Sequence, residues 1–192
     1  MPDSLENTLN GHVAVISKIK NLQADIDHLL EALSTAVRSG HKILLAGNGG
    51  SAADAQHIAA ELIIRLSKDV QRPAIPAIAL TTDSSILTAG GNDIGFDNVF
   101  ARQVEGLGRK GDLLWLISTS GNSPNLIKAA QKGLEQGCTV AALLGRDGGP
   151  LRDLCRYSVV VPSDNTQYIQ EAHMVIYHYL CEQLERTLYP GK

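Results

Sequence analysis

The sequence predicts an α/β fold: a three-layer sandwich in which helices cover both faces of a central parallel sheet of about five strands. Short apolar or β-branched runs alternate along the chain with segments of helical periodicity. In addition, the run Leu113–Ile117 shows no alternation of polar and apolar residues. A strand has this pattern when helices cover both faces of its sheet.

The strands are expected at five apolar runs. These runs span residues 42–46, 76–80, 112–117, 139–144 and 157–161, and most are followed by a helical pattern. Because parallel strands need crossover connections, this order predicts right-handed β-α-β units.

Helical segments lie before and after the predicted sheet. Apolar residues recur at helical spacing from residue 3 to 39, where Gly40 closes the second of two helices, and residues 166–188 form one long helical pattern. These helices exceed what one small sheet needs as cover. We therefore expect a single domain over 1–192, in which 1–40 pack in an oligomer and 41–192 form the sheet core and the C-terminal helix.

Composition excludes several classes of protein. The chain has 192 residues, of which 44% are hydrophobic and 19% charged, as expected for a globular domain that buries its own core. A net charge of -3 without a basic run argues against a large nucleic-acid or membrane footprint. No run reaches the roughly 18 apolar residues of a membrane span, and residues 1–10 are too polar for a secretory signal. We expect a cytoplasmic protein.

The cysteines predict reduced thiols in the core. Cys138, Cys155 and Cys181 are odd in number, far apart, in apolar surroundings and without Cys-x-x-Cys spacing.

Ligands of open parallel sheets bind beyond the carboxyl ends of the strands, so the loops there are the first candidates for a site. The loop Gly47-Asn48-Gly49-Gly50-Ser51 follows the first strand, and Ser51 to Asp54 have the form of a capping box that opens a helix. Glycines and free N–H groups would let an anionic or hydroxyl oxygen approach. A tight strand-to-helix turn is an equal alternative.

The loop after the third strand predicts a phosphate site. It reads Ser118-Thr119-Ser120-Gly121-Asn122-Ser123-Pro124, with Ser123 placed as the N-cap and Pro124 as the first helical residue. Adjacent hydroxyls, backbone N–H groups and a helix dipole can hold a phosphate without Lys or Arg. A simple cap would leave Ser118, Thr119 and Ser120 unexplained.

Polar side chains on two helical segments are candidate metal ligands. His57 and Glu61 are four residues apart and share one helix face, where they either bind a divalent metal or form a solvated pair. The C-terminal segment adds Gln170, Glu171, His173 and His178. Spacing alone does not select the ligands, since either histidine can equally be a core or interface residue.

A further polar group lies between the second and third strands. Gly91-Asn92-Asp93 occupies a loop and short helix region. Its side chains could bond sugar hydroxyls, and an Asx turn explains them equally well.

Together these motifs resemble the phosphoheptose isomerase family of the sugar isomerase (SIS) domain proteins. In chain order the resemblance is carried by Gly47-Asn48-Gly49-Gly50-Ser51, His57-x-x-x-Glu61, Gly91-Asn92-Asp93, Ser118-Thr119-Ser120-Gly121-Asn122-Ser123, and Ile169-Gln170-Glu171 with His178. It runs over nearly the whole chain. Each motif is weak alone, and the combination is specific.

The resemblance implies a flavodoxin-like SIS fold and a homotetramer with sites at subunit contacts. It implies conversion of D-sedoheptulose 7-phosphate to D-glycero-D-manno-heptose 7-phosphate through an enediol, the first step toward ADP-heptose and the lipopolysaccharide core. Glu61 would be the base and His178 the acid. One zinc per subunit would be held by His57, Glu61, Gln170 and His178. The implied substrate contacts are Asn48, Gly49, Gly50, Asn92, Asp93, Ser118, Thr119, Ser120, Ser123 and Gln170.

Two positions leave questions. Some relatives have Asp three residues before this Gln, where this chain has Gln167. Gln170 and His178 are eight residues apart, which on one helix is about 12 Å of rise and about 80° of rotation, too far to share an ion readily. We hypothesise that the helix begins after Gln170, or that the two ligands of one site come from different subunits.

Two rival functions remain. A non-catalytic tetrameric SIS protein that binds the bacterial replication initiator is similar around residues 181–190. That relative lacks the full His, Glu and His set, which this chain has at His57, Glu61 and His178. The other rival is an SIS isomerase that acts on a pentose or hexose phosphate.

Overall fold

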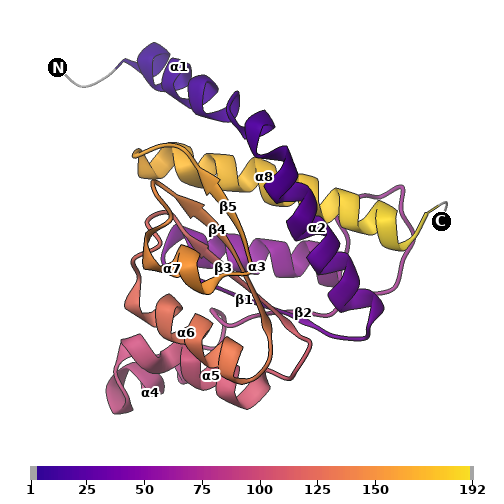
Figure 1. Cartoon of the computed structure of the whole chain (residues 1–192), viewed down its shortest axis with the longest axis vertical. Coiled ribbons are helices and arrows are strands. Elements are labelled where there is room, and N and C mark those ends of the chain that lie inside the picture. Colours follow the sequence, from indigo (N-terminus) through magenta and orange to yellow (C-terminus); the bar gives the residue numbers. More distant parts are fainter. Residues whose placement is uncertain (1–3, 191–192) are drawn as a thin grey trace.

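Each of the five apolar runs forms a strand of one parallel sheet (Figure 1). The structure is a computed structural model that describes residues 4–190. Its strands are β1 (Ile43–Gly47), β2 (Ala77–Ala79), β3 (Leu113–Ser118), β4 (Thr139–Gly145) and β5 (Tyr157–Val161). The predicted α/β sandwich is confirmed, with strand ends that differ from the predicted ones by one residue at most.

The order of the strands places a ligand site between β1 and β3. The sheet runs β2-β1-β3-β4-β5, so the chain leaves β1 toward one edge and then returns to the other side of β1 to form β3. This is the flavodoxin-like order, in which the reversal opens a crevice at the carboxyl ends of the two strands. The glycine loop follows β1 and the Ser-Thr-Ser loop follows β3, so both lie at this crevice.

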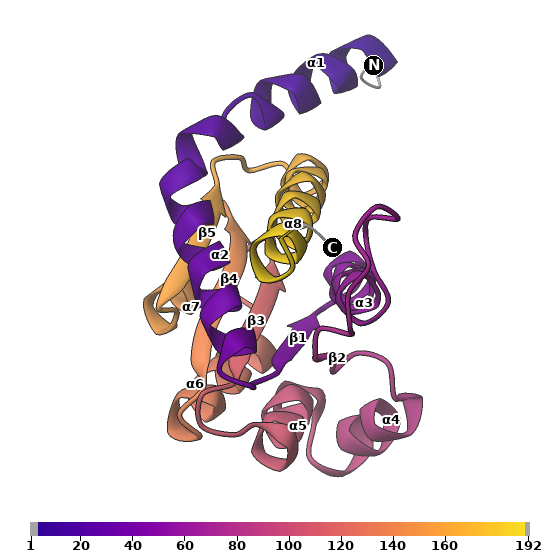
Figure 2. The same cartoon turned by 90° about the vertical axis from the view of Figure 1, so that its right-hand side faces the viewer.

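Helices cover both faces of the sheet (Figure 2). One face carries α2 (Gln23–Arg38), α3 (Gly50–Ile63) and α8 (Thr166–Leu188), and the other carries α5 (Val99–Leu107), α6 (Pro124–Glu135) and α7 (Gly149–Leu154). The remaining helices are α1 (Leu5–Ile16), α4 (Ser84–Asp93) and the short 3-10 helices η1 (Ile19–Leu22) and η2 (Phe96–Asn98). Both helices predicted before the first strand are present, joined by η1.

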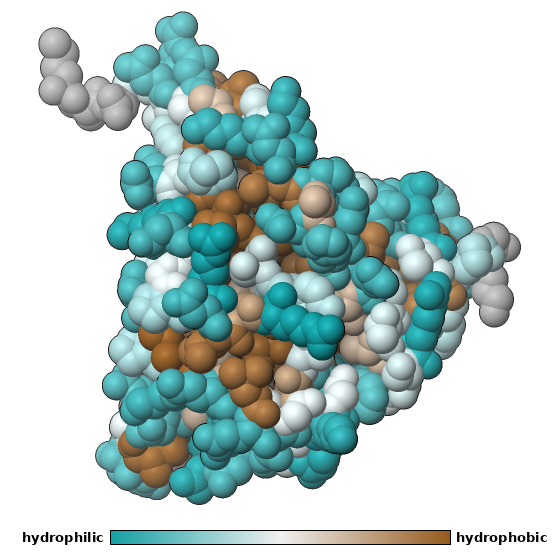
Figure 3. All heavy atoms as spheres, viewed as in Figure 1, coloured by the Kyte–Doolittle hydropathy of each residue, from teal (hydrophilic) through white to brown (hydrophobic). Residues whose placement is uncertain are grey.

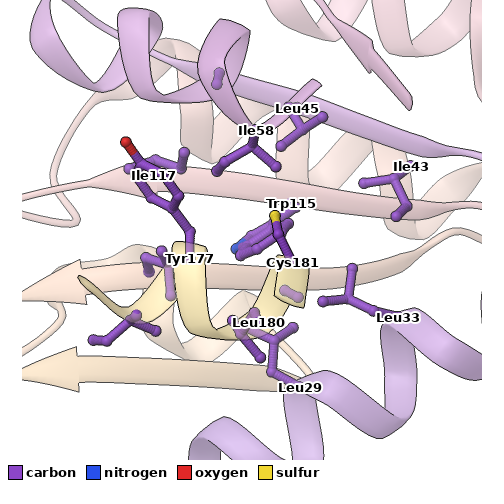
Figure 4. Close-up of a cluster of buried hydrophobic side chains, with 14 of the residues drawn as sticks. Leu29, Leu33, Ile43, Leu45, Ile58, Trp115, Ile117, Tyr177, Leu180 and Cys181 are labelled. Atoms are coloured by element: carbon purple, nitrogen blue, oxygen red, sulfur yellow. The ribbon is translucent and has the colours of Figure 1, made fainter. Parts of the chain in front are cut away.

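Two apolar cores follow from the pleat of the strands, because successive side chains point to opposite faces. Leu113, Trp115 and Ile117 pack toward α2, α3 and α8, whereas Leu114 and Leu116 pack toward α5 and α6. Figure 4 shows Tyr177, Leu180 and Cys181 of α8 beside Trp115. These contacts fix α8 to the centre of the sheet.

The long C-terminal helix begins at its predicted residue. The side chain of Asn165 accepts hydrogen bonds from the backbone N–H groups of Gln167 (2.9 Å) and Tyr168 (3.3 Å), which caps α8 ahead of Thr166. Gln170 and His178 therefore lie on one continuous helix. The hypothesis that the helix begins after Gln170 is wrong, because the Asn165 cap starts it earlier.

The three cysteines are free thiols, as predicted. Cys138 and Cys181 are buried, and Cys155 is partly buried. Burial raises the pKa of Cys155 and of Cys181 to about 12, so these thiols stay protonated and unreactive near neutral pH. None of the helices between residues 4 and 190 is both long enough and apolar enough to cross a bilayer.

Candidate active site

A small polar pocket lies at the carboxyl ends of β1 and β3. Its volume is about 80 Å³. Its lining consists of Asn48, Ser51, Ile117, Ser118, Thr119, Ser120 and Ser123. We call this group of residues the hydroxyl cradle. The Ser-Thr-Ser loop therefore opens onto a cavity, as a phosphate site requires.

The loop of the cradle is ordered by its own hydroxyl groups. Ser118 Oγ accepts a hydrogen bond from the N–H of Gly121 (3.0 Å), and Ser120 Oγ accepts one from the N–H of Asn122 (3.3 Å). Ser123 is the N-cap residue of α6 and Pro124 the first helical residue, as predicted, but the Ser123 hydroxyl makes no capping hydrogen bond. That hydroxyl is available to a ligand at the positive end of the helix dipole.

Two asparagine amides join the loops on either side of the cradle. Asn48 donates to Asn125 Oδ1 (2.9 Å), and Asn125 donates back to Asn48 Oδ1 (2.8 Å). Asn125 lies in the first turn of α6 and is buried. Sequence reasoning missed this residue, because an Asn inside a helical pattern carries no signal of a partner that is 77 positions away.

The predicted capping box at Ser51 and Asp54 is wrong. Gly49, with φ of 55° and ψ of -121°, is the N-cap of α3, and the helix begins at Gly50. Ser51 and Asp54 are buried inside the helix instead, where Ser51 lines the cradle and Asp54 faces α8. The positive φ that glycine permits starts the helix two residues earlier than a cap at Ser51 would.

Two imidazoles and one carboxylate come together between α3 and α8. His57 Nε2 lies 3.1 Å from Glu61 Oε1, and the rings of His57 and His178 are 5.0 Å apart between centroids. His57 and Glu61 come from one face of α3, and His178 comes from α8. We call these three residues the His-Glu-His cluster.

A buried hydrogen-bond network contacts the cluster at His57 Nδ1, the ring nitrogen that does not face Glu61. The hydroxyl of Tyr177 lies 3.0 Å from His57 Nδ1 and donates to Asp54 Oδ1 at 3.4 Å, and Gln170 Nε2 donates to the other oxygen, Asp54 Oδ2, at 3.5 Å. Sequence reasoning missed Asp54 and Tyr177. The signal for Asp54 was present, since residues 54, 57 and 61 recur at i, i+3 and i+7 on one face of a helix. Tyr177 looked like one more apolar core position.

Burial sets the protonation of two of these groups. It raises the pKa of Asp54, partly offset by the hydrogen bonds from Gln170 and Tyr177 and by the charge of His57. Burial and the neighbouring His57 lower the pKa of His178, and Glu61 opposes this shift. Neutral imidazole is therefore favoured at His178, which is the form that binds metals.

Gln170 lies at the other end of α3 from the cluster. Its side-chain amide rests against Gly50, where an added Cβ would overlap it. It thus faces the start of α3, about two helical turns from His57. Gln167 is exposed in the first turn of α8, and its backbone N–H donates to Asn165.

Asn92 and Asp93 are not brought to the cradle within this chain. They are exposed at the C-terminal end of α4, where Asn92 donates to Asp93 Oδ1 at 2.7 Å. A larger cavity, of about 370 Å³, lies at the amino ends of the strands, opposite the cradle, and its lining includes His41 and Arg156 but no residue of the cradle or the cluster.

The cluster fits zinc in the kind of its donors. Two imidazoles and a carboxylate are a frequent catalytic zinc set, and the hydroxyl of Tyr177 links the other ring nitrogen of His57 to the Asp54 carboxylate, which would orient the ring as an outer partner does. Among residues 4–190, however, no three His, Cys, Asp or Glu side chains are arranged so that they could hold an ion by themselves. A zinc site here needs a further donor and some movement of these side chains.

His173 is a core histidine. It is fully buried, and its Nε2 lies 2.9 Å from the carbonyl oxygen of Leu144, so Nε2 carries the proton. Burial lowers the pKa of His173 to about 4. Of the two readings that the sequence left open for this residue, packing in the core is the one that the structure supports.

Because His173 is buried, we expect the stability of the protein to depend on pH. An unfolded histidine has a pKa of about 6.5, so between about pH 6.5 and about pH 4 the unfolded chain binds the additional proton. The free energy of unfolding should fall by about 2 kcal/mol from about pH 7 to about pH 5 through this group. In His173→Gln, which keeps a donor for Leu144, the free energy of unfolding measured with urea should depend less steeply on pH than in the wild-type protein. An unchanged slope in that variant would contradict this assignment.

Comparisons with known proteins identify the family of the chain. Residues 9–145 match the SIS domain family model. Phosphoheptose isomerase from Pelobacter propionicus is 56% identical over 190 residues, covering 98% of this chain and all of that protein. The enzyme of the same name from Akkermansia muciniphila is 44% identical and covers both chains completely.

Solved structures give the same result. A phosphoheptose isomerase from Francisella tularensis superposes with a TM-score of 0.88 at 34% identity, covering 95% of this chain and 96% of that one. Phosphoheptose isomerase GmhA from Neisseria gonorrhoeae gives 0.83 at 40% identity, covering 94% and 98%. The parallel α/β sheet and the SIS domain match define the class of this chain as an SIS-domain isomerase. The chain belongs to the phosphoheptose isomerase family.

Proposed function

We propose that this protein is an aldose-ketose isomerase that converts D-sedoheptulose 7-phosphate to D-glycero-D-manno-heptose 7-phosphate through an enediol. This would be the first step toward ADP-heptose and the lipopolysaccharide core. The observation that carries the proposal is the convergence of His57, Glu61 and His178 on the helix that begins at the hydroxyl cradle. The full-length similarity to phosphoheptose isomerases supports it.

The cradle would bind the phosphate of the sugar. Ser118, Thr119, Ser120 and Ser123 offer hydroxyls, and the glycine loop at Asn48, Gly49 and Gly50 offers backbone and amide groups to the sugar. His57 is seven residues beyond Gly50 on α3, which is about 10 Å along the helix. An extended open-chain sugar phosphate spans a distance of this order, with its phosphate and its carbonyl carbons at opposite ends.

The cluster would move the protons. Glu61 as base takes a proton from C1 of the ketose while His178 supplies one to O2, which gives the enediol. Return of the carbon-bound proton to C2 and removal of the O1 proton give the aldose. A carboxylate can take a proton from carbon and an imidazole N–H can donate one to oxygen, so the two groups suit these two exchanges.

The donor set of the cluster supports a zinc ion as cofactor, one per subunit, held by His57, Glu61, Gln170 and His178. When bound, zinc would polarise the carbonyl and stabilise the negative charge of the enediolate. Since the Asn165 cap places Gln170 and His178 on one helix, we propose that Gln170 reaches the ion from a neighbouring subunit.

Removal of zinc is expected to abolish most of the activity. Charge stabilisation by a metal contributes several kcal/mol, so protein stripped with a chelator should lose about 100-fold or more of its turnover of sedoheptulose 7-phosphate. Added zinc should restore it. Full activity in protein shown to be metal-free by atomic absorption would exclude the cofactor and leave the phosphate site untouched.

The exposed apolar surface supports a homotetramer. Leu5, Leu9 and Val13 form an exposed stripe on α1, whose first turns extend beyond the rest of the chain (Figures 1 and 2) while its second half contacts α8. Met174 and Val175 of α8 are also exposed. Apolar residues reach the surface where α1 meets α8 (Figure 3). A second copy that covers this area would bury surface that one chain leaves in water.

Mixing two inactive variants tests the shared site. Gln170→Ala and Glu61→Gln should each be inactive alone. If one subunit supplies Gln170 and another the cluster, subunits mixed by unfolding and refolding together should regain activity, because some sites then hold wild-type residues from both chains. Each variant refolded alone is the control. Mixed oligomers without activity would place all ligands in one subunit.

The rival functions are less well supported. A non-catalytic SIS protein that binds the replication initiator does not need His57, Glu61 and His178 to converge. A pentose or hexose phosphate would fit the same cradle, and competition between these substrates measures the preference. A phosphorylated metabolite as substrate favours the cytoplasm as the compartment.

A further inference from the structure

A buried ion pair ties the end of α3 to α8. Arg72 lies in the segment between α3 and β2, which forms neither helix nor strand. Its Nη2 is 2.6 Å from Glu185 Oε1, and its Nε donates to the same oxygen at 2.8 Å. The side chains are only 0% and 1% exposed, so solvent screens this pair very little.

The pair also satisfies the open backbone groups around it. Arg72 donates to the carbonyl oxygens of Glu61 (2.7 Å) and Leu62 (2.8 Å), in the last turn of α3. The last carbonyl oxygens of a helix accept no hydrogen bond from within that helix, and a cation near the C-terminal end of a helix is stabilising. Glu185 in turn accepts hydrogen bonds from the N–H groups of Leu66 (3.0 Å) and Ser67 (3.2 Å).

The pair contacts both helices that carry the cluster, because Arg72 binds the end of α3 and Glu185 belongs to α8. Arg72 holds the backbone of Glu61 itself. Glu185 is seven residues after His178 on α8, which is about two turns along the same face. One guanidinium and one carboxylate therefore connect the backbone of the proposed base to the helix of the proposed acid.

We propose that Arg72 and Glu185 are positioning residues that set the separation of Glu61 from His178. The inference rests on the proposed isomerase function. Neither residue belongs to the cradle or the cluster, so both act through the backbone of α3 and through α8. Loosening the pair should lower kcat and leave phosphate binding unchanged, because the cradle lies at the other end of α3.

The test separates positioning from stability. Removing one partner, as in Glu185→Gln, leaves a buried charge and risks unfolding. The double variant R72M/E185M replaces both with apolar side chains of similar length, so it leaves no buried charge unpaired, and it removes the hydrogen bonds to the backbone of Glu61, Leu62, Leu66 and Ser67. We expect it to fold, to lose about 10- to 100-fold in kcat, and to keep KM within about twofold, because small displacements of reacting groups cost this much.

Asp112→Asn is the matched control. Asp112 is also a buried carboxylate that pairs with a cation, Lys42, and accepts backbone N–H groups, but it lies just before β3, the central strand, and contacts neither α3 nor α8 through these bonds. Its loss should lower the melting temperature without changing kcat per folded subunit. R72M/E185M with wild-type kcat, or with changes in kcat and KM that match those of Asp112→Asn, would overturn the inference.

A crystal structure of R72M/E185M makes the outcome independent of the proposed function. We expect the last turn of α3, with Glu61, to be displaced relative to His178. An unchanged Glu61 position would refute the positioning role even if the wild-type protein had no isomerase activity. Wild-type protein that is inactive on sugar phosphates would instead refute the proposed function alone.

Discussion

Replacing Glu61 by Gln is expected to lower kcat by about three orders of magnitude. The amide keeps the shape of the side chain and cannot take the proton from carbon. KM should change little, since the cradle that binds the phosphate contains no atom of Glu61. Conversion of sedoheptulose 7-phosphate followed by NMR in the presence of excess zinc measures both constants, and the zinc content of the variant shows whether a ligand was lost.

Glu182→Gln is the control for this substitution. Glu182 is a partly exposed carboxylate on α8 that pairs with Arg186, so its loss removes the same charge without touching the cluster. The variant should keep wild-type kcat. If Glu61→Gln retained more than about a tenth of wild-type kcat with zinc bound, Glu61 would not be the base.

Gly121→Ala should raise KM by about 100-fold. Gly121 has φ of 64°, and an added Cβ would overlap the carbonyl oxygen of Gly148, which is backbone and cannot turn away. The collision pushes the loop that carries Ser118 and Ser120 away from its hydrogen-bonded form. Steady-state kinetics should show the higher KM, and the affinity for inorganic phosphate, measured by direct binding, should fall.

Gly137→Ala controls for backbone strain. Gly137 also has positive φ, 75°, but an added Cβ there meets Lys110, most closely its flexible side chain at 3.1 Å, away from the cradle. Gly137→Ala should lower the free energy of unfolding by about 1–2 kcal/mol, which is also the loss expected from the positive φ of Gly121 alone. It should leave KM unchanged. Equal KM values for the two variants would mean that the loop does not bind the phosphate.

The fold was predictable from the sequence because its signals are local. The Leu113–Ile117 run forms a strand that is buried on both faces, and the 166–188 pattern forms α8 with the same bounds. The residues that start a helix were harder to predict. Ser51 and Asp54 match a capping box, yet the positive φ of Gly49 started the helix earlier and left Asp54 for a buried network.

The site was predictable only in part. The pairing of His57 with Glu61 follows from helical spacing, and the family resemblance added His178, which meets them through tertiary packing of α8 on α3. Nothing local distinguishes Arg72 or Glu185 from ordinary surface charges. Their burial depends on a segment without regular structure that folds against α8, and such packing leaves no periodic trace in a sequence.

Isomerisation in deuterium oxide tests the central claim most directly. Purified, zinc-loaded protein incubated with D-sedoheptulose 7-phosphate should produce D-glycero-D-manno-heptose 7-phosphate, and NMR should show deuterium at C2 of the aldose, since the carboxylate of Glu61 exchanges its proton with solvent while the enediol exists. Glu61→Gln in parallel should give neither product nor exchange. Absence of product and of exchange from the zinc-loaded wild-type protein would contradict the proposal that the cluster and the cradle form the active site of a sugar-phosphate isomerase.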